Sequence, residues 1–376
     1  MSRSLAGPRV AVVGGGVLGV STAAQLARRG ADVVLVTEGA LGSGASGRSL
    51  AWLNSFGGMR SEAYHQLRMA GIDRYRTLAA RVPGVTEYLR FDGGLTWAEP
   101  GKEHLHREQL AHMRRHGYDA RWIGPDEVAS CTPGVDPRAV PADGAIFNPG
   151  EGWVDLIRLI GHLADELKDA GGRVLTETGP ASVLTGGSGV RAVTAPSGER
   201  LEVDHVLLAA GAEVPRMLSQ YDVKIPDATS TALLVRTKPV AVTLRATLNT
   251  PHVSLRPTPD GGLVMDSDEA AAKVVAGSDG SYDVPPGAAG ALLAEASRIL
   301  AEHPALEVWS LGVGAKPIPG DGEPVLGAVS QVPGLHVAFT HSGATLALIA
   351  GELIAEEILT GDPSPLLADF SPERFQ

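Results

Sequence analysis

Residues 9–38, RVAVVGGGVLGVSTAAQLARRGADVVLVTE, decide how the chain begins to fold. Residues 9–13 are a short apolar run rich in β-branched side chains, which predicts a buried parallel strand. Residues 17–29 have helical periodicity and are followed by Gly30, a residue that commonly ends a helix. Residues 31–36 predict a second strand. This order of strand, glycine turn, helix and strand is the context in which such a turn binds a dinucleotide.

The glycines of this unit follow the spacing G-x-G-x-x-G. Gly14 permits the tight turn, Gly16 lets the backbone approach a pyrophosphate, and Gly19 lets the helix pack closely on the strand. The helix N-terminus offers unpaired N–H groups and a partial positive charge to phosphates. Glu38, just past the second strand, can accept hydrogen bonds from an adenosine ribose and repels a 2′-phosphate, which argues against NADP. The unit alone does not separate FAD from NAD.

Three later stretches favour FAD. Residues 41–48, LGSGASGR, form a loop of small residues that can wrap a long cofactor with backbone N–H groups and the Ser46 hydroxyl. Residues 204–212, DHVLLAAGA, predict an apolar strand that ends in small residues over which a cofactor can pass. A helix predicted from His341 to about residue 359 would place its N-terminus where a reduced flavin carries negative charge.

Composition limits the other classes. The chain has 376 residues, enough for two domains, and a formal net charge of −11, which disfavours nucleic acid and anionic membranes as partners. Its single cysteine, Cys131, excludes an internal disulfide and fits a reducing compartment. No apolar run is long enough to span a bilayer, and residues 1–8 lack the apolar core of a signal peptide. We therefore expect a cytoplasmic protein.

The remaining periodicity predicts further elements. An amphipathic helix is expected over residues 152–170. Strands are expected over residues 172–177, 181–185, 190–195, 232–237 and 240–245, and as a pair around Asp260 and Gly261.

At this point the sequence resembles the FAD-dependent D-amino-acid oxidase superfamily, in particular its glycine oxidase and sarcosine oxidase branch. The resemblance is carried by the first unit with Glu38, by GASGR in residues 44–48 and by DHVLLAAGA. It continues through RPTPDGGL from Arg256, PGDGEPVLG from Pro319 and PGLHVAFTHSGATLA from Pro333. These motifs span nearly the whole chain in the family's order, and the last two are the most specific.

The resemblance implies an α/β fold, α+β overall. A Rossmann-like FAD-binding domain would comprise residues 1–51, 146–212 and 308–376. A substrate domain built on a mixed, largely antiparallel sheet would be inserted as residues 52–145 and 213–307. It would cover the face of the flavin.

The resemblance also implies the reaction. A C–N bond next to a carboxylate of a small amino acid or amine is oxidised by hydride transfer to FAD, the imine is hydrolysed, and oxygen reoxidises the flavin to give hydrogen peroxide. Two alternatives are a dehydrogenase of the same fold that passes electrons to a carrier, and a tailoring flavoenzyme with a specialised biosynthetic substrate. An NAD-dependent dehydrogenase is the alternative outside this class. The oligomeric state is left open.

Three residues are candidates for the substrate side. In the glycine and D-amino-acid oxidases an arginine precedes the proline ahead of the P-x-D-G turn, and here that position is Lys316. A lysine supplies a point charge without the bidentate geometry of arginine, or it is simply a solvated surface residue. Arg256 either faces the flavin or caps a strand edge, and His341 either places a proton or caps the last helix.

The cofactor contacts follow from the motifs. We expect FAD to be bound non-covalently, because Cys131 is far from the final G-D-G turn and no histidine lies beside the early loop, and we expect no metal site. The predicted FAD-binding residues are Gly14, Gly16, Val17, Leu18, Gly19, Glu38, Gly44, Ala45, Ser46, Arg48, Val183, Ala210, Gly211, Asp321, Ser342, Gly343, Ala344, Thr345 and Leu346.

Overall fold

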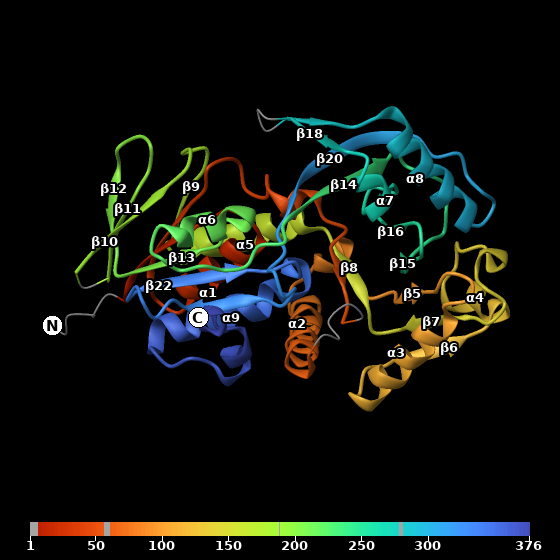
Figure 1. The fold of residues 1–376 in the computed structure, drawn as a ribbon, viewed down its shortest axis with the longest axis horizontal. Coiled ribbons are helices and arrows are strands. Elements are labelled where there is room, and N and C mark those ends of the chain that lie inside the picture. The colour runs from red at the N-terminus through yellow and green to blue at the C-terminus, as the bar shows by residue number, and fades with distance from the viewer. Residues whose placement is uncertain (1–6, 56–60, 188, 278–280) are drawn as a thin grey trace.

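The first strand lies inside a six-stranded sheet of the computed structural model, which describes residues 7–55, 61–187, 189–277 and 281–376 (Figure 1). The strands pair in parallel, except that the edge strand β21 runs antiparallel to β22. Their order is β21 (Val325–Ala328), β22 (Leu335–Phe339), β13 (His205–Leu208), β1 (Arg9–Val13), β2 (Asp32–Val36) and β9 (Arg173–Leu175).

Both faces of this sheet are covered, as its continuous apolar strands require. Val10 and Val12 face the helices α1 (Val17–Arg28), α5 (Leu156–Asp169) and α9 (Gly343–Thr360). Ala11 and Val13 face the opposite side, where a small antiparallel sheet packs. That sheet contains β10 (Ser182–Gly186), β11 (Gly189–Thr194) and β12 (Arg200–Glu202). The strands expected over residues 181–185 and 190–195 therefore exist, but they form a separate layer beside the parallel sheet.

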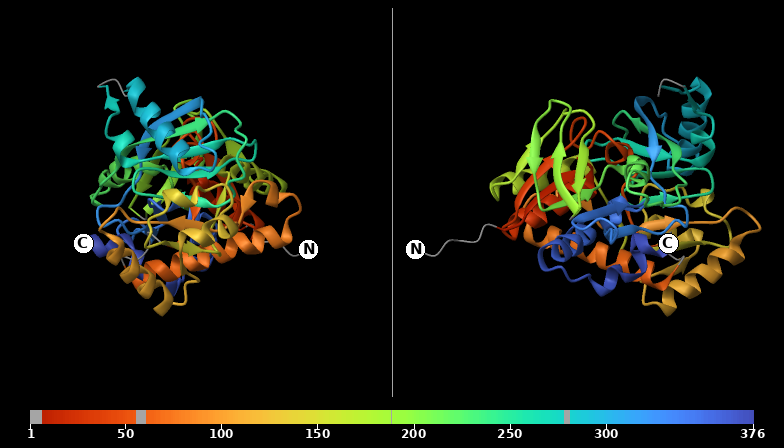
Figure 2. Two further views of the ribbon diagram at one scale, coloured as in Figure 1. Left: turned by 90° about the vertical axis from the view of Figure 1, so that its right-hand side faces the viewer. Right: turned by 60° about the vertical axis from the view of Figure 1, so that its left-hand side comes forward.

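A second, eight-stranded sheet lies on the other side of the molecule from β10–β12 (Figure 2). Its pairings are antiparallel apart from β15 with β5, which confirms the predicted mixed, largely antiparallel sheet. α8 (Pro286–Ile299) covers its apolar face. The strand order is β20 (Val308–Lys316), β14 (Ser230–Thr237), β17 (Leu263–Asp266), β16 (Ser254–Pro257), β15 (Thr247–Asn249), β5 (Gly94–Thr96), β7 (Ala145–Asn148) and β6 (Arg121–Ile123).

Shorter elements connect these layers. A three-stranded sheet contains β3 (Trp52–Leu53), β8 (Gly152–Val154) and β4 (Leu89–Arg90). The further helices are α2 (Glu62–Arg81), α3 (Glu103–Arg115), α4 (Pro125–Cys131), α6 (Val214–Ser219) and α7 (Asp268–Ala271). β18 (Val275–Ala276) pairs antiparallel with β19 (Tyr282–Asp283), and a 3₁₀ turn, η1 (Ala45–Arg48), follows β2.

Three expected elements need correction. Residues 240–245 are not a strand. Residues 152–154 form β8, and the helix begins only after Asp155, whose side chain accepts hydrogen bonds from the N–H groups of Ile157 and Arg158. α9 begins at Gly343 rather than at His341. In the described residues, no helix is both long and apolar enough to cross a membrane.

The division into two domains stays a prediction. Two strands near its proposed boundaries, β7 and β20, lie in the eight-stranded sheet. α2, which was assigned to the inserted segment, packs into the same core as α9. Gly71 of α2 shows how close the two helices are, because a Cβ there would lie 2.3 Å from the Thr345 carbonyl oxygen.

Candidate functional site

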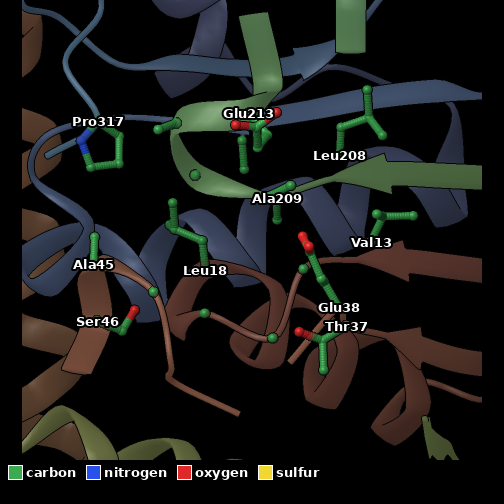
Figure 3. Close-up of a pocket in the computed structure, with 18 of the residues that line it drawn as sticks. Val13, Leu18, Thr37, Glu38, Ala45, Ser46, Leu208, Ala209, Glu213 and Pro317 are labelled. Atoms are coloured by element: carbon green, nitrogen blue, oxygen red, sulfur yellow. The ribbon is translucent and has the colours of Figure 1, made fainter. Parts of the chain in front are cut away.

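A cavity of about 740 Å³ lies at the carboxyl ends of β1, β2 and β13 (Figure 3). Open parallel sheets bind ligands at this edge. Figure 3 shows that three stretches far apart in the sequence meet there: Thr37 and Glu38, Ala45 and Ser46, and Leu208 with Ala209. The beginning of α9 lines the same cavity through Gly343 and Ala344.

The first glycine turn has the geometry that the sequence predicts. Gly14 has φ +124°, and a Cβ there would lie 2.3 Å from the Ala209 carbonyl oxygen, so a larger residue would collide with β13. A Cβ on Gly19 would lie 2.0 Å from the Gly14 carbonyl oxygen. Gly19 does not line the cavity, and its role is the close packing of α1 on the turn. Gly16, Val17 and Leu18 do line it.

The loop after β2 closes one side of the cavity. Gly44, Ala45, Ser46 and Arg48 all line it, as expected. The Ser46 hydroxyl accepts a hydrogen bond of 3.0 Å from the Val17 N–H, which ties this loop to the first turn of α1. The Arg48 side chain lies across β20, where hypothetical Cβ atoms on the facing glycines would come within 3.2 Å of it.

The opposite wall contains the other predicted small residues. Glu38, Val183, Ala210 and Gly211 line the cavity, and Glu38 is solvent-exposed there. Sequence reasoning missed several polar lining residues. Thr37 and Thr340 directly follow the ends of β2 and β22, and this position is a signal that could have identified them. Further examples are Glu213, Arg216 and Gln220 on the segment after β13.

Besides Gly19, four predicted cofactor residues do not line the cavity. Asp321 pairs with Arg374, at 2.9 Å between Oδ2 and Nε, and so holds the C-terminal segment. Ser342, Thr345 and Leu346 are buried behind the cavity wall. The Thr345 hydroxyl donates to the Trp52 carbonyl oxygen at 3.2 Å, because its side chain points to β3. These residues support the first turn of α9 from behind.

The start of α9 presents polar backbone to the cavity. The residue before the helix, Ser342, makes no side-chain capping bond to the backbone N–H groups of the first turn, whereas Gly343 and Ala344 line the cavity. An 18-residue helix carries a partial positive charge at this end, which favours an anion. His341 is exposed and lines the cavity just ahead of the helix.

Lys316 lies at the end of β20 between two residues that line the cavity, Ala315 and Pro317, but does not line it itself. The Lys316 side chain is 29 % exposed. Its Nζ lies 3.5 Å from Oδ1 of Asp268, whose side chain is almost fully exposed to solvent. Burial raises the pKa of Asp266 to about 6, and the Lys316 charge partly opposes that rise. Asp266 ends the otherwise apolar strand β17, and neither Asp266 nor Lys316 lines the cavity.

Arg256 is held by contacts with the surrounding protein. It is buried, and its guanidinium donates to the carbonyl oxygens of Leu50, Pro257 at 2.8 Å and Val154 at 3.4 Å. It stacks 4.9 Å above the Trp153 ring, and burial lowers its pKa to about 10. Arg256 does not line the 740 Å³ cavity, but it lines a second cavity of about 400 Å³ together with Ser46 and Arg48, so its two predicted roles both stay predictions.

The residues present fit FAD. One end of the cavity has the phosphate-accepting turn of Gly14 and Gly16, with Glu38 just past the end of β2 where a ribose would lie. The other end has small residues, among them Ala315 and Ala344, beside the positive end of α9. A long dinucleotide with a flat ring system fits this arrangement, with phosphate at the first helix and a developing negative charge at the last.

The chain matches the DAO family, described as FAD dependent oxidoreductase, over residues 9–357. It is 26 % identical to one of the subunits of opine oxidase from Agrobacterium tumefaciens, covering 97 % of this chain and 96 % of that one. It is also 26 % identical to glycine oxidase of Geobacillus kaustophilus, with 97 % and 96 % covered. The crystal structure of glycine oxidase from Geobacillus kaustophilus superposes with a TM-score of 0.80 at 22 % identity, covering 97 % and 98 %.

L-Proline dehydrogenase from P. horikoshii superposes with a TM-score of 0.83 at 20 % identity, covering 98 % of each chain. The chain therefore belongs to the FAD-dependent oxidoreductases of the D-amino-acid oxidase family, in which the resemblance to the glycine oxidase branch is confirmed. The family decides between the two cofactors that the first βαβ unit left open, in favour of FAD.

Proposed function

We propose that this FAD-dependent oxidoreductase oxidises the C–N bond of a small amino acid or carboxylated amine. The observation that carries the proposal is the continuity of the cavity. It runs from the turn of Gly14 and from Glu38 to Ala315 and Pro317, which flank Lys316. A cofactor held at the first end would present its ring system at the second, close to a cation from the inserted sheet.

Lys316 is proposed to attract the substrate carboxylate. Its ammonium is only partly exposed, and its contact with Asp268 is long and solvated, so it can be exchanged for a substrate at little cost. A lysine binds one carboxylate oxygen as a point charge. We therefore expect a looser requirement for the orientation of the carboxylate than an arginine fork imposes, and a different substrate range from that of glycine oxidase.

Asp266 is proposed to accept a hydrogen bond from the substrate nitrogen. It ends β17, two residues before Asp268, which contacts Lys316, and with a pKa of about 6 it is ionised at neutral pH but close to its titration point. Such a group can hold a proton released from the substrate amine. When bound, FAD accepts the hydride from the α-carbon. The nitrogen lone pair then completes a C=N bond, and water hydrolyses the imine to a carbonyl compound and an amine.

The electron acceptor is proposed to be oxygen, reduced to hydrogen peroxide. Two relatives that are similar over nearly the whole chain, glycine oxidase and the opine oxidase chain, are named as oxidases. The competing proposals are transfer of the electrons to a carrier protein and action on a specialised biosynthetic substrate. Non-covalent attachment of FAD is also part of the proposal.

The test is a screen on purified yellow protein. Glycine, sarcosine, D- and L-amino acids, N-carboxyalkyl amino acids and amines without a carboxylate are each added without oxygen, and bleaching of the flavin absorption is followed. Peroxide formation in air is compared with reduction of an artificial dye. Bleaching by carboxylated amines with peroxide formation is expected; dye reduction without peroxide would favour the carrier. Bleaching by simple amines alone would contradict the proposal. Release of FAD on acid precipitation tests non-covalent binding.

A further inference from the structure

A buried guanidinium lies directly behind the first turn of α9. Arg68 of α2 is 5 % exposed and donates to the Asn54 carbonyl oxygen at 2.9 Å and to Asn54 Oδ1 at 2.7 Å. Its remaining nitrogen donates to the Tyr64 hydroxyl at 3.3 Å and to the Ser342 hydroxyl. Tyr64 and Ser342 also contact each other through their hydroxyl oxygens. Each nitrogen of the Arg68 guanidinium therefore donates to a neutral oxygen, and these hydrogen bonds fix the side chain.

The charge of Arg68 lacks an ionic partner among the described residues. Glu151 is a buried acid whose pKa the Arg68 charge lowers. Burial has the larger effect and raises the pKa of Glu151 to about 8. Glu151 is therefore protonated at neutral pH and does not neutralise the guanidinium. Burying a cation without a counter-ion is unfavourable in free energy, because the charge loses its hydration. An anion that forms nearby offsets this loss by electrostatic attraction.

The contact with Ser342 places the Arg68 guanidinium close to the wall of the cofactor cavity. Ser342 is the residue before α9, and the next two residues, Gly343 and Ala344, line the cavity. The helices approach closely at Gly71, one turn after Arg68, because a Cβ there would meet the Thr345 carbonyl oxygen. The guanidinium and the positive end of α9 therefore act on the same region of the cavity.

We propose that Arg68 is a positioning residue that raises the reduction potential of the bound FAD. It fixes Ser342 and the first turn of α9, and its uncompensated charge favours the reduced cofactor. Accepting a hydride adds one negative charge to the cofactor, and a low-dielectric surrounding strengthens its attraction to a fixed cation. The inference rests on the use of FAD and not on the proposed substrate.

α2 also offers a matched control. Arg74 contacts the same helix α9, but its charge is neutralised by Glu352, at 2.5 Å between Nε and Oε2, and the side chain is 40 % exposed. Arg74→Met removes a cation and an interhelical contact without removing an uncompensated buried charge. An effect of helix docking alone would appear in both variants.

The experiment compares Arg68→Met, Arg68→Lys and Arg74→Met, each loaded with FAD. The reduction potential is measured against reference dyes, and the dissociation constant of sulfite, which adds to oxidised flavin and leaves it negatively charged, is measured by absorbance. Arg68→Met should weaken sulfite binding about tenfold and lower the two-electron potential by about 30 mV. Arg68→Lys should recover more than half of the loss, and Arg74→Met should behave as wild type.

Two results would overturn the inference: an unchanged potential in Arg68→Met, or a loss that Arg68→Lys does not reduce. If Arg68→Met does not fold or does not retain FAD, Ser342→Ala decides, because it removes the hydroxyl that joins Arg68 to α9. A lower potential in Ser342→Ala supports the positioning role of Arg68, and an unchanged potential overturns that role, because this variant removes the contact and keeps the charge. A potential in Arg68→Lys that falls well below that of wild type, although the charge is kept, would overturn the electrostatic role. A colourless wild-type protein would instead refute the use of FAD, and a yellow protein without amine oxidation would leave these potentials measurable.

Discussion

The two ends of the cofactor cavity are built in different ways. The nucleotide end comes from one continuous unit of about thirty residues, in which Gly14, Gly19 and Glu38 take their places through local geometry. The end at which we propose the reaction, called the reacting end, is lined by the end of β20 and the first residues of α9, which are far apart in the chain. Backbone shape specifies the first end, and we propose that charges brought together by tertiary packing determine the chemistry at the second.

This difference separates two kinds of residue. Backbone glycines at the nucleotide end tolerate almost no change, because the neighbouring atoms are other backbone atoms. Lys316 is a partly exposed side chain at the other end, and its replacement should change chemistry more than cofactor content. Substitutions at each end therefore test whether the division holds.

The largest effect is expected for Gly14→Ala. The new Cβ would lie 2.3 Å from the Ala209 carbonyl oxygen at a φ of +124°, so the turn must move. FAD bound per chain, read from absorbance, should fall at least about tenfold, which corresponds to a loss of about 1.4 kcal/mol or more. Gly161→Ala on α5 is the control, since nothing lies within 4 Å of its Cβ position. Full FAD content in Gly14→Ala would contradict the claim that backbone geometry specifies the nucleotide end.

The nucleotide end could be predicted because its signals are local. β1, α1 and β2 lie within one or two residues of the predicted bounds, and Gly16, Glu38 and Ser46 line the cavity. Errors arose where tertiary contacts decide. Residues 240–245 have an apolar pattern but follow the end of β14 as an irregular segment. The cofactor role of Asp321 stays a prediction, and its carboxylate pairs with Arg374, 53 residues later.

The reacting end could be predicted only in part, for the same reason. Lys316 was identified from its position before a proline, whereas Asp266 comes from β17, which β14 separates from β20 in the sheet. Arg68 has no motif around it, and its burial results from the packing of α2 on α9. A single sequence contains no local signal for either placement.

The second largest effect is expected for Lys316→Met. Loss of a charged hydrogen bond to the substrate carboxylate is worth about 1.5–3 kcal/mol, so KM should rise roughly 10- to 100-fold. The FAD spectrum and content should not change, because Lys316 does not line the cavity. Lys238→Met, which removes a surface partner of Glu307 on the same sheet, should leave KM as it is. A normal KM in Lys316→Met would remove this residue from the site.

A smaller effect is expected for Glu38→Gln, at the nucleotide end. A carboxylate hydrogen-bonded to ribose is replaced by an amide of the same shape, so the dissociation constant of FAD, measured by fluorescence titration, should rise about tenfold. kcat at saturating FAD should stay unchanged, in contrast to substitutions at the reacting end. Asp32→Asn, an exposed acid at the start of the same strand, provides the control. Equal affinity in Glu38→Gln would contradict the ribose contact.

The smallest effect concerns stability and belongs to Glu151, beside the reacting end. Burial raises its pKa from 4.5 to about 8, with the Tyr118 hydroxyl donating to it. The folded chain therefore keeps a proton that the unfolded chain loses near pH 4.5, so this contribution to stability is complete below that pH and is lost as pH rises through 8. Because an amide cannot ionise, Glu151→Gln should remove this pH dependence.

Thermal midpoints at about pH 5.5 and about pH 7.5 measure that slope. Wild type should lose more stability than Glu151→Gln across this interval, and the difference should be roughly 2–5 °C, since one proton per molecule changes the free energy of unfolding by about 1.4 kcal/mol per pH unit. Glu202→Gln, an exposed acid on β12, should follow wild type. Parallel curves for Glu151→Gln and wild type would mean that Glu151 is ionised in the folded protein. Arg68 would then have a counter-ion, and the electrostatic part of its proposed effect on FAD would fail with it.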